Sequence, residues 1–238
     1  RFKLSGANVT LVFDRGIISD DNAQLIKDAK MKYISALDRN QIAGCGIDLS
    51  PFKKIASEDV SPKPDGFKKY DDQLYFYDHG VIDDKRFIVG FNPTLFAEDR
   101  KNRKEKIDFF EVYLKNENKA LKNAQRDRKR QATEGRVLNE LKRLKIKKYY
   151  EHPVLYPLVV KKQLKNGTVK SVASFRVQVN KKAEIIVADK LLDGVCVFIT
   201  NHIERQGRGF QISPSKVIRA YRNKTKIEDV IQKREVIS

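Results

Sequence analysis

Cysteine is scarce in this sequence, which has only Cys45 and Cys196 in 238 residues. The two lie far apart and neither belongs to a C-x-x-C pair, which argues against a disulfide framework and against a zinc site. The three histidines show no ligand spacing, and no Ser-His-Asp or Cys-His arrangement can be argued from the sequence. Two isolated thiols suit a reducing compartment, so we expect a cytoplasmic protein.

Long apolar runs are also missing. No stretch approaches the roughly 18 residues that a membrane span needs, and no signal peptide is visible, so we expect no membrane association. The glycine-containing stretch GRGF at 207–210 is too short to cradle a phosphate, and no nucleotide cofactor is implied. The sequence begins with Arg1 and contains one methionine, Met31, so we expect a piece of a longer chain.

Positive charge is abundant, with 49 Lys and Arg against 31 Asp and Glu and a net charge of +18. Because like charges repel in a compact state, such an excess favours a polyanionic partner, most often nucleic acid, over a basic protein without one. The segment 119–148 alone has 12 Lys and Arg and three Asp and Glu, a net charge of +9. We interpret it as a helical surface that follows a phosphate backbone, the alternative being a solvated helix face. Its densest cations are Arg126, Arg128, Lys129 and Arg130.

No aromatic residues interleave with the cations of this segment, so base stacking is not indicated there.

The first 40 residues predict an α/β fold. A β-branched run at 8–13 ends at Asp14, Ser19 is a candidate N-cap for a helix with acids in its first turn, and 32–37 predicts a second strand. Together they indicate a right-handed parallel β-α-β unit. Ligands of such sheets gather at the carboxyl ends of strands, where Asp14 stands.

The rest of the chain predicts a mixed middle and a closing helix. We expect paired strands at 73–80 and 85–92, then two helices between 95 and 148 that break near Gly135. A hairpin over 156–179 turns at Asn166-Gly167, and a strand follows at 194–201. A helix starts at Ser213, with Pro214 at its first position. We therefore predict core segments at 1–40 and 211–238 and an inserted basic, β-rich α+β subdomain at 41–210.

Three polar residues share one face of that last helix. Tyr221, Lys224 and Glu228 follow the spacing i, i+3 and i+7, which places them on one stripe. With Asp14, Glu228 could hold divalent metal, because phosphodiester chemistry uses two metals about 4 Å apart bridged by carboxylates. The alternative is a strand-tip acid that caps a turn and an amphipathic helix with a polar face.

These stretches resemble the DDE transposases of bacterial insertion sequences, and more narrowly the insertion-sequence-four family. The resemblance spans nearly the whole chain and is carried by VTLVFDRGIISDDN, KYISAL, LLDGVCVFITN and SPSKVIRAYRNKTKIED. It implies an RNase H-like core with a β-rich insertion, in which Asp14 and Glu228 are the second and third acids of the catalytic triad. It further implies a two-metal site for Mg²⁺ or Mn²⁺, cleavage and strand transfer at the ends of an insertion element, and a dimer on DNA. Tyr221 and Lys224 would hold DNA phosphates.

Two departures from the family pattern bear on activity. None of the 13 residues before Asp14 is acidic, so the family's first Asp is absent; Asp38 is a lesser candidate for a further acid. Glu235 stands where the family has lysine. We therefore expect a fragment that is inactive alone. The alternatives are a catalytically inactive remnant that binds DNA non-specifically and an RNase H-like nuclease. For a flipped base the chain offers Tyr and Phe in place of tryptophan.

Overall fold

The computed structural model of this chain describes residues 9–16, 19–57 and 65–235, with the backbone alone over 54–57 and 225–235. The chain divides into two compact units. One comprises Arg1–Ala97 and Leu191–Ser238, and the other comprises Glu98–Lys190. The prediction placed the boundaries of the inserted segment at 41 and 210. The difference arises because strands from 68–91 and 195–200 pair into the same sheet as the opening strands.

The first unit is mixed α/β and opens with the predicted β-α-β arrangement. Strand β1 (Thr10–Val12) pairs in parallel with β2 (Lys32–Ala36), and helix α1 (Asp20–Asp28) lies between them in sequence. The Ser19 side chain accepts a hydrogen bond from the Asn22 amide at 3.2 Å, so it is the N-cap. Asp20 and Asp21 in the first turn complement the helix dipole.

In the described part of the chain, six strands form the sheet of this unit, in the order β1-β2-β8-β5-β4-β3. The added strands are antiparallel: β3 (Lys68–Lys69), β4 (Tyr75–Ile82), β5 (Lys85–Phe91) and β8 (Val195–Thr200). The predicted pairing of 73–80 with 85–92 is confirmed as β4 and β5. Asp83 and Asp84 form the turn between β4 and β5. Both have positive φ, which is the backbone conformation that a two-residue hairpin turn requires to match the right-handed twist of its strands.

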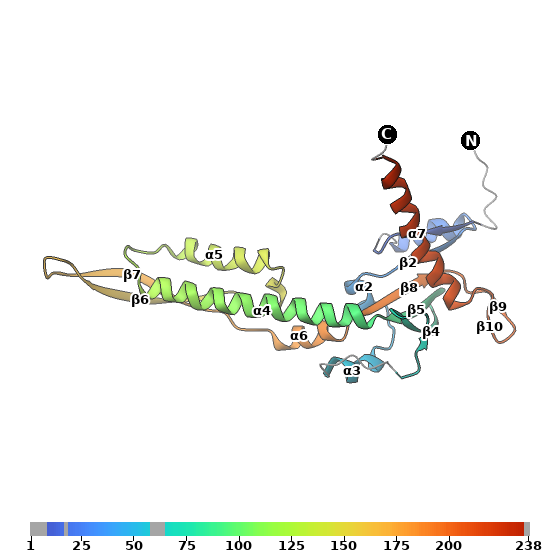
Figure 1. The fold of residues 1–238 in the computed structure, drawn as a ribbon, viewed down its shortest axis with the longest axis horizontal. Helices are drawn as coiled ribbons and strands as arrows, with labels where there is room; N and C mark the ends of the chain where they lie inside the picture. Colours follow the sequence, from blue (N-terminus) through green and yellow to red (C-terminus); the bar gives the residue numbers. More distant parts are fainter. Residues whose placement is uncertain (1–8, 17–18, 58–64, 236–238) are drawn as a thin grey trace. The chain divides into compact units, whose positions relative to one another are not determined.

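Helices cover both faces of this sheet (Figure 1). Alternate residues along β8 face opposite cores: Val197 and Ile199 belong to one apolar cluster, and Phe198 belongs to the other. The first cluster packs under α1, α2 (Arg39–Gly44) and α3 (Ser50–Ser57). The second packs under α7 (Pro214–Glu235), whose Val217 and Ile218 are fully buried. A two-stranded ribbon, β9 (Arg205–Gln206) with β10 (Gly209–Phe210), precedes α7.

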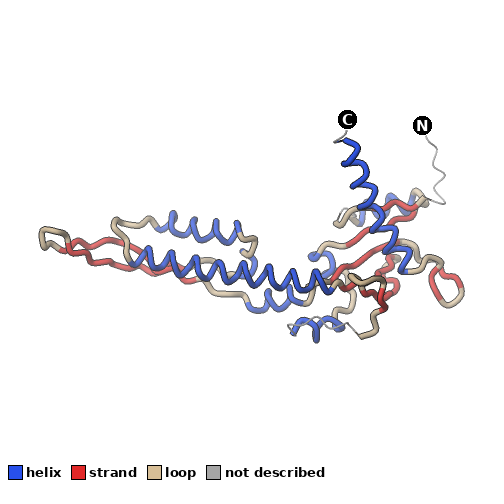
Figure 2. Tube along the Cα trace, viewed as in Figure 1, coloured by secondary structure: helices blue, strands red, loops and turns tan. Residues whose placement is uncertain are grey.

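The second unit is built on α4 (Pro93–Lys122) from Glu98 onward, α5 (Arg130–Arg143), a 3₁₀ turn at Lys147–Tyr149 and α6 (Ala183–Lys190). A hairpin of β6 (Val154–Gln163) and β7 (Val169–Gln178) runs beside α4 (Figure 2). The predicted hairpin over 156–179 is confirmed as β6 and β7. Gly167 lies in its turn and has φ +82°. The apolar residues that predicted the two helices all lie in one core, namely Ile107, Phe110, Leu114, Leu121, Val137, Leu141 and Leu144.

The predicted helix break near Gly135 is wrong, because α5 passes through this residue without interruption. The chain leaves the helix earlier, at 123–129, where it meets β7. There the Ala173 amide donates to Asp127 Oδ1 at 2.8 Å and the Ala173 carbonyl accepts from the Arg128 amide at 2.9 Å. These bonds satisfy one edge position of β7 and attach the connection to the hairpin.

Candidate active site at the end of strand β1

Backbone contacts fix the position of Asp14 just beyond the end of β1. The amide of Phe13 donates to the Ile34 carbonyl at 3.0 Å, and the amide of Gly16 donates to the Ala36 carbonyl at 3.1 Å. The Ser35 hydroxyl donates to the Asp14 carbonyl at 2.8 Å. The chain therefore follows β2 past the strand end and presents an Asp14 side chain that is 57% exposed.

A second carboxylate approaches this turn. Gly16 has φ +76°, and a Cβ atom there would lie 2.2 Å from Oδ2 of Asp38. Glycine is needed both for the positive φ and for this close approach. Asp38 also precedes α2, where its amide donates to Oε1 of Gln41 at 2.9 Å, so a helix-capping position accounts for an acid there.

Helix α7 brings two of the predicted residues to Asp14. Lys224 forms an ion pair with Asp14 and is 18% exposed. Tyr221, one turn earlier, packs edge-on against Phe198 of β8 with ring centroids 5.3 Å apart. Burial raises the pKa of the Tyr221 hydroxyl, while the positive charges of Arg15 and Lys224 act in the opposite direction.

The start of α7 is attached to the sheet by Arg86 of β5. Its guanidinium donates to both carboxylate oxygens of Asp78, at 3.2 and 2.7 Å, and to the Ile212 carbonyl at 2.6 Å. The Phe210 ring covers the same guanidinium at 3.9 Å. Arg86 is thus 1% exposed, and sequence reasoning missed it because a Lys-Arg pair at a strand start looks like a solvated edge.

The structure brings together Asp14, Tyr221 and Lys224, which are up to 210 residues apart in sequence. Residue 228 lies on the backbone of α7, one turn beyond Lys224, but its side chain lies outside the described part of the chain. Within the residues whose side chains are described, no three His, Cys, Asp or Glu residues are grouped to hold a metal ion. Of the two predicted metal ligands, Asp14 is the one whose side chain lies in the described part of the chain.

The predicted DNA-binding cations Arg126, Arg128, Lys129 and Arg130 lie elsewhere, in the second unit. They occupy the connection between α4 and the start of α5, so this part of 119–148 is a loop. Most of the segment is helical as expected, on the end of α4 and on α5. Arg128 is half-buried and the other three are exposed.

Residues 98–190 as a whole contain 26 Lys and Arg and 12 Asp and Glu, a net charge of +14 out of the chain's +18. The β6–β7 hairpin contributes cations that sequence reasoning did not single out. Between Val154 and Gln178 there are five, with no acid: Lys161, Lys162, Lys165, Lys170 and Arg176. A stretch of 25 residues with five cations and no acid is visible in the sequence, and it could have identified the hairpin as a basic surface.

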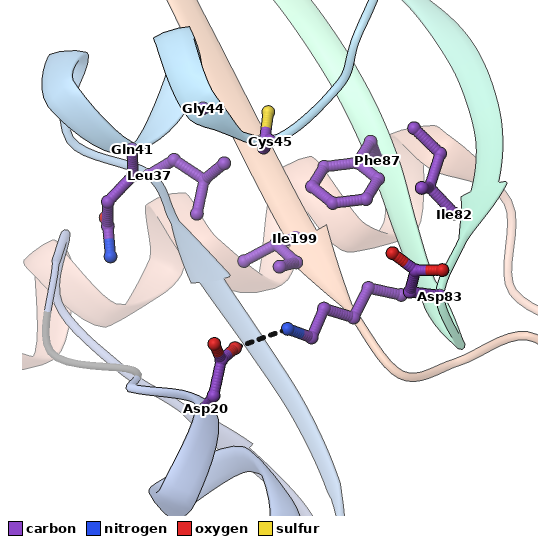
Figure 3. A pocket seen from close by; sticks show the side chains of 10 residues that line it. Asp20, Leu37, Gln41, Gly44, Cys45, Ile82, Asp83, Phe87 and Ile199 are labelled. Carbon is purple, nitrogen blue, oxygen red and sulfur yellow. Dashed lines mark hydrogen bonds and ion pairs between the residues drawn. The ribbon is translucent and has the colours of Figure 1, made fainter.

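A hollow of about 380 Å³ lies on the face of the sheet opposite α7 (Figure 3). Apolar side chains line it, among them Leu37 just after β2, Phe87 of β5 and Ile199 of β8, and Cys45 of the turn after α2 joins them. Asp20 and Lys85 form an ion pair of 2.5 Å at its border, which lowers the pKa of Asp20. Of the predicted site residues whose side chains are described, none lines this hollow.

Comparisons of the chain with known protein families, with curated proteins and with solved structures find no match. In the part of the chain that the structure describes, none of the helices has an apolar stretch long enough to cross a membrane.

Proposed function

We propose that this chain forms the catalytic core of a DNA transposase with an RNase H-like plan, which cleaves and joins DNA at the ends of an insertion element. The observation that supports this is the contact between Asp14, at the carboxyl end of β1, and Lys224 of α7. The contact joins the opening β-α-β unit and the closing helix into one site, with the basic unit between them in sequence. This is the arrangement that the DDE resemblance implies.

The roles in this proposal follow from residue chemistry. Asp14 and Glu228 would hold Mg²⁺ or Mn²⁺, since carboxylate oxygens are the ligands these ions prefer. Bound metal would activate the attacking oxygen and stabilise the leaving one. Lys224 would leave Asp14 for the scissile phosphate and stabilise the charge that develops there. The Tyr221 hydroxyl would donate a hydrogen bond to the same phosphate.

DNA is the proposed partner, both as the terminal inverted repeats of the element and as the target. The net charge of +14 on residues 98–190 supports this, because neutralised phosphates release counterions and drive binding. Arg126, Lys129 and Arg130 are exposed and can reach a phosphate backbone. We further propose a dimer that holds two DNA ends, acting in the bacterial cytoplasm at the nucleoid.

A second candidate function is DNA binding without catalysis. It is supported by the same basic unit and requires neither Asp14 nor Glu228. A third, hydrolysis by an RNase H-like nuclease, would use the same acids and differ in its products.

One assay separates these candidates. The whole gene product that contains this chain is incubated with Mg²⁺ or Mn²⁺, a supercoiled plasmid and labelled duplexes made from the DNA that flanks its coding segment. A transposase gives cleaved ends joined to the plasmid, and chelation of the metal abolishes both products. Cleavage without joining would replace the proposal by the nuclease. Salt-sensitive binding without cleavage would replace it by the binding module.

A further inference from the structure

The second unit contains a groove of about 1000 Å³ between α4 and the β6–β7 hairpin. One wall carries Lys115, Lys119 and Lys122 of α4, and the other carries Arg176 of β7. Among the described residues that line the groove, none is Asp or Glu. The floor is apolar and includes Phe175, so the groove combines a row of cations with an exposed aromatic surface.

Hydrogen bonds between α4 and β7 hold the groove open at a fixed width. The Asn118 side chain accepts from the Val177 amide at 2.8 Å and donates to the Val177 carbonyl at 2.9 Å. Leu121 lies one turn beyond Asn118 on α4, and its carbonyl accepts from the buried Ser174 hydroxyl of β7 at 2.7 Å. The walls are therefore parts of regular elements joined by satisfied polar contacts, which keeps the site in shape before a ligand arrives.

The positive charge of the groove is not neutralised by neighbouring acids. Two acids of α4 close to the lysine row are paired elsewhere, Glu111 with Lys181 and Glu117 with Arg136. Among the described residues, no ion pair is formed by Lys115, Lys119, Lys122 or Arg176. The helix dipole accounts for lysines in the last turn of α4, but it does not account for Lys115 or for a cation on β7.

We propose that this groove binds a single-stranded segment of nucleic acid. Lys115 and Lys122 are separated by about 10 Å along the helix axis, which spans two or three phosphates of one strand. A duplex would offer the apolar floor only sugar and phosphate, whereas a single strand offers base faces. Phe175 is partly buried, its exposed part would contact a base, and Leu158 and Val112 extend the apolar surface.

This site is assembled from residues far apart in sequence. No aromatic residue interleaves with the cations along 119–148, but β7 places Phe175 beside them in space. The proposal rests on the proposed function in taking DNA as the partner, and it names a segment of unpaired strand that the cleaved or opened DNA would supply. It requires no contribution from Asp14.

The test uses the whole chain and fluorescence anisotropy with two probes, an oligothymidine of about twenty nucleotides and a duplex of similar length. The groove variant is Lys115→Gln/Lys119→Gln/Lys122→Gln. Its matched control removes three exposed lysines of the same unit that lie outside the segment 119–148 and outside the groove, Lys101→Gln/Lys104→Gln/Lys106→Gln. We expect the groove variant to bind oligothymidine about tenfold more weakly and to lower the slope of log affinity against log salt by about 2. The control should change the affinity by less than about twofold.

Phe175→Leu tests the aromatic floor while keeping it apolar. Loss of stacking on one base should weaken oligothymidine binding about fivefold or more and leave duplex binding within about twofold. Equal losses in the groove and control variants, or a Phe175→Leu variant that affects both probes alike, would overturn the proposal. Competition by poly-glutamate as effective as that by oligothymidine would assign the groove to acidic peptides instead. Thermal melts check that each variant folds.

Failure of this proposal is distinguishable from failure of the proposed function. Asp14→Asn should abolish cleavage and leave oligothymidine binding unchanged. If the protein has no cleavage activity but the groove variant still binds oligothymidine more weakly than the control, the transposase proposal is rejected and the groove proposal stands. If the protein cleaves DNA ends but the groove and control variants bind oligothymidine equally well, the groove proposal is rejected and the transposase proposal stands.

Discussion

The Arg86 side chain offers the sharpest test of how the sheet positions α7. We predict that Arg86→Met lowers the free energy of unfolding by about 3 kcal/mol. Methionine keeps an apolar stem in the space of the arginine but removes the guanidinium donors to Asp78 and to the Ile212 carbonyl. The Ile212 carbonyl then loses the guanidinium donor, and Asp78 keeps the Gly80 amide at 3.3 Å but no counter-charge from residue 86.

The magnitude follows from burial. Breaking a fully buried ion pair by removing one partner costs about 3–5 kcal/mol. The Asp78 side chain is 26% exposed, so it recovers part of its hydration, and the lower end of that range applies. The contact of the guanidinium with the Phe210 ring adds to the loss.

Urea denaturation followed by circular dichroism measures the change, with Arg219→Met, an exposed arginine of α7, as the control that should stay within about 0.5 kcal/mol. A double-mutant cycle with Asp78→Asn should give a coupling energy of about 1.5 kcal/mol or more. A loss below about 1 kcal/mol together with no coupling would refute the reasoning that Arg86 ties the α7 entry to the sheet.

Three further predictions concern stability. Gly135→Ala should raise the free energy of unfolding by about 1 kcal/mol, because Gly135 lies inside α5 and a Cβ atom there would meet no neighbouring side chain within 4 Å. Asn118→Ala should lower it by about 2 kcal/mol, because it removes both side-chain bonds to Val177. His202 has a pKa lowered from its ordinary value of 6.5 by burial and then by the charge of Lys32. The unfolded chain therefore binds the proton more readily, and His202 should reduce stability as the pH falls below about 6.5.

Denaturation at several pH values checks these predictions together. The exposed neighbour Asn116 supplies the control for Asn118, and Asn116→Ala should be neutral within about 0.5 kcal/mol. His202→Gln should flatten the decline in stability below pH 6.5, and an unchanged decline would contradict the assignment. A destabilised Gly135→Ala variant would show that the helix needs glycine there for a contact not recognised in α5.

Local signals predicted much of this fold. The Ser19 cap, the Asn166-Gly167 turn and the apolar periodicity of α4 and α5 are decided by neighbours in sequence, and each is present. The break at Gly135 was wrong because glycine lowers helix propensity by only about 1 kcal/mol, which packing of Val137 and Leu141 exceeds. The short helices α2 and α3 carried too few turns to show a period.

The candidate site was predictable only in part. The face of α7 that carries Tyr221 and Lys224 follows from helical spacing, but its contact with Asp14 depends on pairing between strands that are distant in sequence. The buried role of Arg86 depends on Asp78 and Ile212, which no local pattern connects. The groove beside α4 could not be predicted because its aromatic floor comes from β7.

The most direct test of the proposed active site is the rate of DNA-end cleavage by acid-to-amide variants of the whole gene product that contains this chain. Asp14→Asn and Glu228→Gln should each reduce the rate by about a thousandfold or more, because each removes charge stabilisation at the reacting phosphate. Asp21→Asn, an exposed acid in the first turn of α1, should leave the rate unchanged. Cleavage that persists at the normal rate in either variant would contradict the assignment of Asp14 and Glu228 as the catalytic acids.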